Sequence, residues 1–474
     1  MKRTKIIATI GPASEGKKVL TEMMKNGMNV ARLNFSHSDL SWHKRAIGMI
    51  REIGEKMKKP IGIMADLQGP RIRIANNKEQ RVKKGEIILI TSIKEKKSGG
   101  DKIIYLDLPE AVKLVKTGNE ILVEDGLIKL KVIGKSGRFV KCEAMNEGIV
   151  KPKKGVNIPG ISAQLGALTG KDREVLDFAL KQDIDFVAMS FVRAAREIEN
   201  LKRLIRRKIR DKSKLPQVIA KIERREAVKN FDEILKVADA IMVARGDLGI
   251  EMPQEEVPIL QKEMAAKSLR AGKPVIVATQ MLDSMIRNPR PTRAEVTDVA
   301  NAVVDHADAV MLSGETASGK YPAEAVKTMR QIIEKTEESP FDDLGHGFLG
   351  DQTSSVSAAV AQSAHELLKD SGAKAIVVAS VSGFTARMII RHRPEQKVYV
   401  MTNNEKTSNQ LTLVWGVESF VLPDCRDLDE LLDRSMGTLK KNKLLKSGDR
   451  VVIVAGRPHV KREHMSLVKV EEIK

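Results

Sequence analysis

Aromatic residues, cysteines and long apolar runs are all scarce in this chain of 474 residues. Aromatic residues make up 3% of it, so the lysine-rich stretches lack the interleaved rings that stack on nucleic-acid bases. The two cysteines, Cys142 and Cys425, are far apart, which excludes a disulfide framework and a structural zinc signature and favours a reducing compartment. No apolar run approaches the length of a membrane span, and the basic N-terminus has no apolar signal core. We therefore expect a cytoplasmic protein without a membrane partner.

Basic residues, in contrast, are abundant. The chain carries 82 Lys and Arg against 62 Asp and Glu, a net charge of +20. Such an excess favours anionic partners such as phosphates, nucleic acid or acidic surfaces, but a solvated lysine-rich surface explains it equally well. Hydrophobic residues, at 42%, are enough for full-sized cores, and the length corresponds to about three domains.

Short apolar runs of β type alternate with helical patterns in two parts of the chain. Three strand–helix units precede residue 70, and five more follow residue 169. Eight such units are the number found in a (β/α)₈ barrel, the TIM barrel. The expected strands span residues 5–10, 29–34, 60–66, 186–190, 217–222, 240–244, 274–278 and 309–312.

Two further domains are expected around this barrel. Between Pro70 and Lys154 the helical period disappears and short alternating runs separated by glycines predict a small inserted β-barrel. Beyond the last barrel helix, strands and helices alternate as in a doubly wound α/β domain. We assign the barrel to residues 1–69 and 156–338, the insertion to 70–155, a linker to 339–353 and the C-terminal domain to 354–474.

Polar and charged residues follow most of the expected barrel strands. In a (β/α)₈ barrel the active site lies at these C-terminal strand ends. Strand ends are often polar simply because they reach solvent, but this explains less well why both signs of charge are mixed. Lys221 and Glu223 are two residues apart, so an extended strand directs both into one pocket. The full set is Arg32, Asn34, Asp66, Ser190, Lys221, Glu223, Arg245, Asp247, Thr279, Gln280, Ser313 and Glu315.

Glu223 and Asp247 follow consecutive strands, so their carboxylates can converge on one cation. Two carboxylates without His or Cys suit Mg²⁺ or Mn²⁺, which keep waters and substrate oxygens as further ligands. Lys221 and Arg32 can supply positive charge to a phosphoryl group. The glycines of the segment 245–249 allow backbone N–H groups to approach a small anion, although a glycine turn without a ligand is the alternative.

A second phosphate site is possible in the C-terminal domain. Ser380, Ser382 and Thr385 cluster at a strand-to-helix turn. Their hydroxyls can hold a phosphorylated effector, or they can serve only as helix caps.

Eight segments of the chain resemble the pyruvate kinase family. The resemblance runs in order from residue 1 to about residue 335 and continues more loosely through the C-terminal domain. The matching segments are 4–12, 29–37, 65–70, 154–160, 220–223, 241–249, 278–281 and 311–316.

The resemblance implies phosphoryl transfer from phosphoenolpyruvate to ADP, followed by protonation of the enolate to pyruvate. It assigns Mg²⁺ to Glu223 and Asp247, with a second Mg²⁺ arriving with the nucleotide. Lys221 and Arg32 would contact the phosphoryl group, and the N–H groups of Gly246 and Asp247 would take the substrate carboxylate. Thr279 would position the water that delivers the proton.

The resemblance also assigns residues to the nucleotide, and it implies a homotetramer. The positions that match the surroundings of the nucleotide phosphates are Asn34, Ser36, His37, Arg73 and Lys154. Because Arg73 and Lys154 flank the two hinges of the insertion, this domain resembles the family's lid, which closes to exclude water.

Two departures from the family pattern affect cation and effector use. Asn34, Ser36, Asp66 and Leu67 match monovalent-cation positions, but Arg71 stands where potassium-dependent members carry a glutamate. A fixed cation there can replace the ion, so we expect activity without added K⁺. The segment 454–462 lacks the glycine–threonine–asparagine pattern of many bacterial relatives, which leaves the effector open.

Two alternatives remain at this point. A Mg²⁺-dependent keto-acid lyase on the same barrel would share the carboxylate pair but would not need Arg73, Lys154 or a nucleotide lid. A nucleic-acid-binding protein derived from the enzyme would use the positive charge and would bind RNA with a steep salt dependence.

Overall fold

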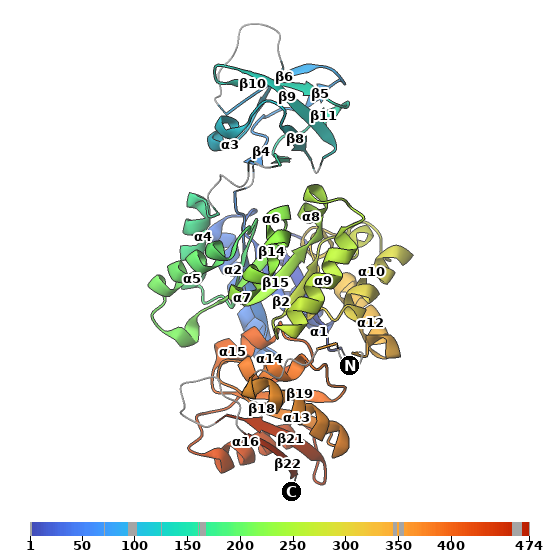
Figure 1. Cartoon of the computed structure of the whole chain (residues 1–474). Helices are drawn as coiled ribbons and strands as arrows, with labels where there is room; N and C mark the ends of the chain where they lie inside the picture. The colour runs from blue at the N-terminus through green and yellow to red at the C-terminus, as the bar shows by residue number, and fades with distance from the viewer. Residues whose placement is uncertain are drawn as a thin grey trace.

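The computed structural model has three parts that follow one another along its long axis, with the insertion at one end and the C-terminal domain at the other (Figure 1). It describes residues 2–70, 72–92, 102–124, 126–159, 161, 167–344, 348–349, 355–456 and 467–473. Within these ranges no helix combines the length and apolarity that crossing a bilayer requires.

The central part is a closed barrel of eight parallel strands, as predicted. Neighbouring strands follow chain order, and the first strand closes the ring by pairing with the last, Lys5 opposite Ala309. Their short β-branched and alanine-rich runs are buried on both faces, as expected of parallel strands covered by helices. The strands are β1 (Lys5–Ile10), β2 (Met28–Asn34), β3 (Gly62–Leu67), β13 (Phe186–Met189), β14 (Gln217–Ile222), β15 (Ala240–Ala244), β16 (Val275–Ala278) and β17 (Ala309–Leu312).

Amphipathic helices surround these strands. Two of them begin with capping boxes, in which Thr169 pairs with Asp172 and Thr292 with Glu295, so their starts are fixed by side-chain hydrogen bonds. The helices of this part are α1 (Lys17–Lys25), α2 (Leu40–Lys56), α4 (Gly170–Lys181), α5 (Ala195–Lys208), α6 (Arg225–Lys229), α7 (Phe231–Val237), α8 (Arg245–Glu251), α9 (Val257–Arg270), α10 (Arg293–Val304), α11 (Gly314–Ala317) and α12 (Pro322–Glu337).

The insertion follows β3 and has its own apolar core. Its main sheet has seven strands in the order β4-β12-β8-β9-β10-β6-β7, beside a two-stranded sheet of β11 and β5. A single antiparallel bridge between Ile74 and Leu106, just beyond β4 and β7, joins the two edges and closes the sheet into a small barrel. Its elements are β4 (Ile72–Arg73), β5 (Gln80–Val82), β6 (Ile87–Thr91), β7 (Lys102–Tyr105), α3 (Pro109–Leu114), β8 (Glu120–Val123), β9 (Ile128–Ser136), β10 (Phe139–Ala144), β11 (Gly148–Val150) and β12 (Gly155–Asn157).

The C-terminal domain is a five-stranded sheet with helices, in the order β20-β19-β18-β21-β22. The last strand, β22, pairs antiparallel with β21 and was not predicted. The elements are α13 (Val356–Asp370), β18 (Ala375–Ala379), α14 (Phe384–Ile390), β19 (Lys397–Thr402), α15 (Glu405–Leu411), β20 (Val417–Val421), α16 (Leu428–Lys441), β21 (Arg450–Ala455) and β22 (Leu467–Glu472). The expected linker at 339–353 lies partly outside the described residues, and so does the segment 457–466.

The C-terminal domain packs on the N-terminal ends of the barrel strands. Leu413 enters the cluster of side chains that fills the barrel interior and is fully buried there. Gly62, at the start of β3, permits this approach, because a Cβ at that position would lie 2.5 Å from the Thr412 hydroxyl. Lys406 adds an ion pair to Asp183 at 2.7 Å. The opposite end of the barrel faces the insertion (Figure 1).

Candidate active site

Lys221, at the end of β14, lies among oxygen atoms from two other strand ends. Its Nζ donates to Ser190 Oγ at 2.7 Å and lies 2.9 Å from Glu223 Oε1 and 3.3 Å from Asp66 Oδ1. Burial lowers the pKa of Lys221, but the Asp66 and Glu223 carboxylates more than offset this and raise it above the usual value. The predicted pairing of Lys221 and Glu223 in one pocket is present, and Asp66 is part of it.

Arg32, at the end of β2, binds the other side of the Asp66 carboxylate. Its Nε and Nη2 both lie 2.7 Å from Asp66 Oδ2, and its Nη1 donates to Thr9 Oγ1 at 2.9 Å. Burial raises the pKa of Asp66, but the charges of Lys221 and Arg32 outweigh it and lower the pKa below its usual value. Asp66 therefore stays ionised and holds the two cations beside each other.

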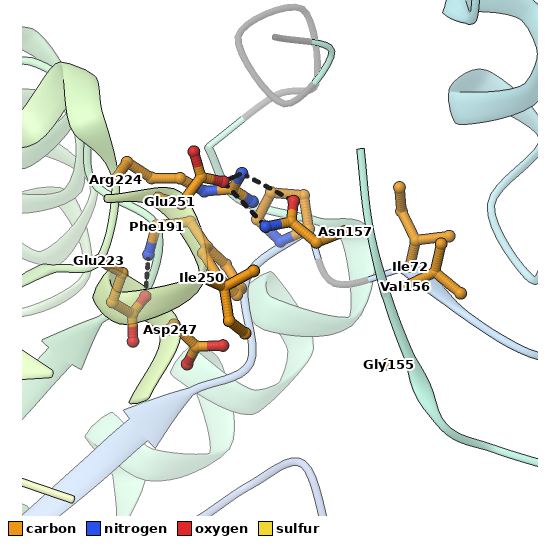
Figure 2. A pocket seen from close by; sticks show the side chains of 11 residues that line it. Ile72, Gly155, Val156, Asn157, Phe191, Glu223, Arg224, Asp247, Ile250 and Glu251 are labelled. Carbon is orange, nitrogen blue, oxygen red and sulfur yellow. Dashed lines mark hydrogen bonds and ion pairs between the residues drawn. The ribbon is translucent and has the colours of Figure 1, made fainter. Parts of the chain in front are cut away.

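Glu223 and Asp247 both line a pocket between the barrel and the insertion (Figure 2). The N–H of Phe191 donates to Glu223 Oε2 at 2.7 Å, and Oε1 forms the ion pair with Lys221 at 2.9 Å. Burial raises the pKa of Glu223, and the Asp247 charge adds to this. Two carboxylates that line one pocket are a fitting place for a divalent cation.

The donor set at this position favours a hard cation. Among the described residues there is no group of three or more His, Cys, Asp and Glu side chains that would enclose a metal. Two carboxylates leave most coordination positions to water or substrate oxygens, which fits Mg²⁺ or Mn²⁺ and does not fit a closed zinc site.

Thr279 follows β16 and has a left-handed backbone, with φ of 73°. Its Oγ1 accepts the N–H of Gly246 at 2.8 Å and donates to Ala278 O at 2.6 Å. Arg245 supports this turn, since it donates to Thr279 O at 2.8 Å and pairs with both oxygens of Asp298. Hydrogen bonds thus join Thr279 to the start of α8, where Asp247 lies. The Gly246 N–H that the resemblance gives to a substrate carboxylate is bonded to Thr279 here.

The residues expected around the nucleotide lie in two separate places. Asn34, Ser36 and His37 follow β2 on the barrel, where Asn34 Oδ1 accepts the Ser36 N–H at 3.1 Å. Arg73 and Lys154 lie on the insertion, and their partners lie there too. Arg73 Nη1 donates to Lys153 O at 3.1 Å, and Lys154 forms an ion pair with Glu124 at 2.7 Å.

The four expected monovalent-cation positions, Asn34, Ser36, Asp66 and Leu67, all lie among the described residues. Leu67 O accepts the Ser190 hydroxyl at 2.8 Å, and Asp66 O accepts the Phe35 N–H at 3.2 Å, so both carbonyls already have a hydrogen-bond donor. Arg71, which we expect to replace the ion, lies outside the described residues.

The sequence did not single out a polar cluster at the hinge between insertion and barrel. Arg224 Nη1 lies 2.5 Å from Glu251 Oε1, and Asn157 Nδ2 donates to the same oxygen at 3.0 Å (Figure 2). Arg224 also stacks over the ring of Phe191, whose N–H binds Glu223. A signal existed, because Asn157 belongs to a segment shared with the family and Arg224 directly follows Glu223.

The turn in the C-terminal domain that we expect to hold an effector has two buried residues and one exposed residue. Ser380 and Thr385 are buried, whereas Ser382 is exposed and its Oγ accepts the Phe384 N–H at 3.4 Å. Gly383 supplies the left-handed residue before α14.

Comparisons with known proteins match both the first and the last part of the chain to one family. Residues 1–326 match the model of the pyruvate kinase barrel domain, and residues 358–471 match that of the pyruvate kinase alpha/beta domain. A pyruvate kinase of Geobacillus stearothermophilus is 44% identical over 477 residues, which cover 100% of this chain and 80% of the relative. One from Sporosarcina psychrophila is 42% identical, covering 100% and 81%. A solved structure of a pyruvate kinase from Cryptosporidium parvum superposes with a TM-score of 0.90 at 35% identity, covering 100% of this chain and 96% of the other.

Proposed function

The chain belongs to the pyruvate kinase family of phosphotransferases, and we propose that Lys221 and its neighbours carry the transfer from phosphoenolpyruvate to ADP. The carrying observation is the placement of two buried cations, Lys221 and Arg32, around one ionised carboxylate, Asp66. The comparisons support neither a keto-acid lyase nor a nucleic-acid-binding protein.

The two cations act on the phosphoryl group. Charge spreads over its oxygens during transfer, so preorganised positive groups stabilise the transition state more than the substrate. The ammonium of Lys221 and the guanidinium of Arg32 are held in place by Asp66 and Ser190 before substrate arrives. Little reorganisation is then needed at the moment of transfer.

Glu223 and Asp247 would hold Mg²⁺ or Mn²⁺. When bound, the cation would offset negative charge on substrate oxygens, and a second Mg²⁺ would arrive with the nucleotide. Gly246 and Asp247 would orient the substrate carboxylate, with the Gly246 N–H exchanging Thr279 for the substrate. The Thr279 hydroxyl would then be released to position the water that protonates the enolate.

Lid closure would complete the nucleotide site. Asn34, Ser36 and His37 lie on the barrel and Arg73 and Lys154 on the insertion, so one ligand must draw the two parts together to contact both sets. Closure would also exclude water, which would otherwise compete for the phosphoryl group.

The family resemblance and the sequence support three further properties of this protein. The protein would form a homotetramer in the cytoplasm, bind a phosphorylated effector at Ser380, Ser382 and Thr385, and turn over without added K⁺. The last depends on Arg71 taking over the charge of the ion near Asn34, Ser36, Asp66 and Leu67.

A coupled assay of pyruvate formation tests the reaction and the cation requirement together. Wild-type enzyme should turn over with phosphoenolpyruvate, ADP and Mg²⁺ in a buffer free of sodium and potassium, and an Arg71→Glu variant should need added K⁺. Pyruvate formation without ADP would contradict phosphoryl transfer. A strict K⁺ requirement of the wild type would contradict only the role of Arg71.

A further inference from the structure

Basic residues concentrate in helix α5 and in the turn that follows it. Residues 200–214 contain eight Lys and Arg but one acidic residue, Asp211, so this segment carries +7 of the net charge of +20. The helix buries Ile198, Leu201 and Ile205 and lies at the outer edge of the barrel (Figure 1). A third of the excess positive charge is therefore gathered in one short segment on the outside of the molecule.

Two of the eight cations have carboxylate partners. Lys202 pairs with Asp239 at 2.6 Å, and Lys208 pairs with Asp177 at 2.7 Å. The other six are exposed and form no ion pair with the residues that the structure describes. These six, which we call the α5 surface, are Arg203, Arg206, Arg207, Arg210, Lys212 and Lys214.

Three arginines of the α5 surface share one side of the helix. Arg206 and Arg207 are three and four residues beyond Arg203, a spacing that makes side chains neighbours on a helix and makes like charges destabilising. Cations in the last turn offset the helix dipole, but this effect falls off within that turn. It does not explain Arg203 or the cations at 210–214, whereas a negatively charged partner accounts for the whole group.

The remaining cations lie on a turn that is held in place. Residues 212–214 form a short 3-10 helix, before which the Asp211 carboxylate accepts the Ser213 N–H at 2.9 Å. Asn404, in the C-terminal domain, donates to Ser213 O at 3.0 Å. That domain packs on the N-terminal ends of the barrel strands, so this turn lies away from the strand ends that carry Lys221.

The segment lacks the apolar side chains that most macromolecular partners require. Protein interfaces have an apolar core, and a helix that binds a bilayer inserts an apolar face. In the described part of the chain, no large exposed hydrophobic residue lies between residues 195 and 216, and the apolar face of α5 is buried in the barrel. The phosphate backbone of a nucleic acid, in contrast, is bound by Lys and Arg without apolar contacts.

The residue types also favour a duplex over a single strand. Residues 195–216 contain no aromatic residue, so the unpaired bases of a single strand would find no ring on which to stack. Four of the six cations are arginines, whose guanidinium groups bind a phosphate through two N–H groups at once. A duplex, in which the bases are already paired and stacked, presents only its phosphates to such a surface.

We propose that the α5 surface binds the phosphate backbone of double-stranded nucleic acid without regard to base sequence. Phosphate contacts carry no sequence information, so duplexes of different sequence, and both DNA and RNA duplexes, should bind. The phosphates relieve the repulsion among the six cations. This partner is additional to the transfer reaction, because the α5 surface contains none of the residues that we propose for that reaction.

Fluorescence anisotropy of the full chain with a short labelled duplex of mixed sequence tests the proposal. Affinity should fall steeply as salt rises, with a slope of log K against log salt of about −5 for six phosphate contacts. An Arg206→Gln/Arg207→Gln variant should bind at least about tenfold more weakly, and its slope should be shallower by about two.

A matched control separates the α5 surface from the overall charge of the chain. Lys18 and Lys25 are exposed on α1, so a Lys18→Gln/Lys25→Gln variant loses the same two charges elsewhere and should bind as the wild type does. Thermal unfolding of both variants should match the wild type, which shows that any loss of binding is not a loss of folding.

The alternative partners are tested in parallel. A single strand of the same length, poly-glutamate and vesicles containing an anionic phospholipid should each bind more weakly than the duplex at equal salt. The proposal is wrong if the duplex does not bind, if any of these three probes binds more tightly, if the Arg206→Gln/Arg207→Gln variant binds unchanged, or if the α1 control loses binding equally.

Discussion

Lys221 keeps its charge in a buried site because two carboxylates face it. An isolated buried lysine would lose its proton, but Asp66 and Glu223 favour the ammonium. The same arrangement makes the carboxylates depend on Lys221, since Asp66 and Glu223 are almost fully buried. The charge of Lys221 that we propose for catalysis and the stability of this part of the barrel thus depend on one set of contacts.

Replacing Lys221 by Met should lower kcat by about 100- to 1,000-fold or more, as loss of a preorganised charge-stabilising group does elsewhere. Steady-state kinetics with phosphoenolpyruvate and ADP measure this. The exposed Lys229→Met change is the matched control and should leave kcat unchanged. Near-normal transfer by a folded Lys221→Met variant would refute the assigned role.

Local spacing predicted part of this site and could not predict the rest. Lys221 and Glu223 share one strand, so their common direction follows from the period of two. Asp66 and Ser190 reach Lys221 only because β3 pairs with β13, where Ala188 lies opposite Asp66. That register depends on how the strands pair in the closed barrel, so it cannot be predicted from the sequence of either strand alone.

At the scale of elements, Asn157 links the insertion to the barrel. It lies on β12, and its amide binds Glu251, at the end of α8, and Arg224, just after β14. The insertion is joined to the barrel near β4 and β12, so under the proposed closure this amide is well placed to set the position of the insertion.

Asn157→Ala should lower kcat/KM for ADP by about tenfold, because hinge changes alter kcat and KM together and two hydrogen bonds of about 1 kcal/mol each are lost. Limited proteolysis at the hinge should become faster. Asn146→Ala, which removes hydrogen bonds inside the insertion only, should leave both measurements near wild type. If both substitutions had equal effects, the effect of Asn157→Ala would reflect a general destabilisation of the insertion, and the hinge role of Asn157 would be wrong.

Most elements follow from the sequence because their apolar runs are long or regularly spaced. All eight barrel strands were predicted within about two residues, as strand signals allow. β22 was missed because it is an edge strand, paired only with β21. Its valines alternate with charged residues, so its apolar pattern is weaker than that of a central strand. Leu413 was also missed, since a single leucine beyond a helix gives no sign that it fills another domain's core.

At the scale of the molecule, Arg3 connects the N-terminus to both large domains. It contacts Glu337 at the end of α12, Asp342 just beyond that helix, Glu395 in the C-terminal domain and the ring of Trp415. Asp342 lies buried in this junction. Burial, followed by the charge of Glu337, raises the pKa of Asp342 to about 7.

This raised pKa makes stability depend on pH at the junction. Protonated Asp342 is favoured in the folded chain, so its contribution is complete below the unfolded value and is lost as the pH rises through about 7. Asp342→Asn should therefore gain stability relative to wild type by roughly 2–3 kcal/mol between about pH 5 and about pH 8. Thermal unfolding across this range measures the difference. The exposed Asp343→Asn change should show no such trend, and a difference that shrinks with rising pH would contradict the assignment.

The seam between β1 and β17 has a consequence for how the chain is made. Lys5 pairs with Ala309, so β1 waits for β17 until nearly the whole barrel has been synthesised. The strands of the insertion lie together in sequence between residues 72 and 157 and enclose their own core, so this domain can form during that interval. Nascent chains long enough for residue 160 to have left the ribosome should thus already contain a folded insertion, whereas the apolar faces of β1, β2 and β3 remain for chaperones to cover.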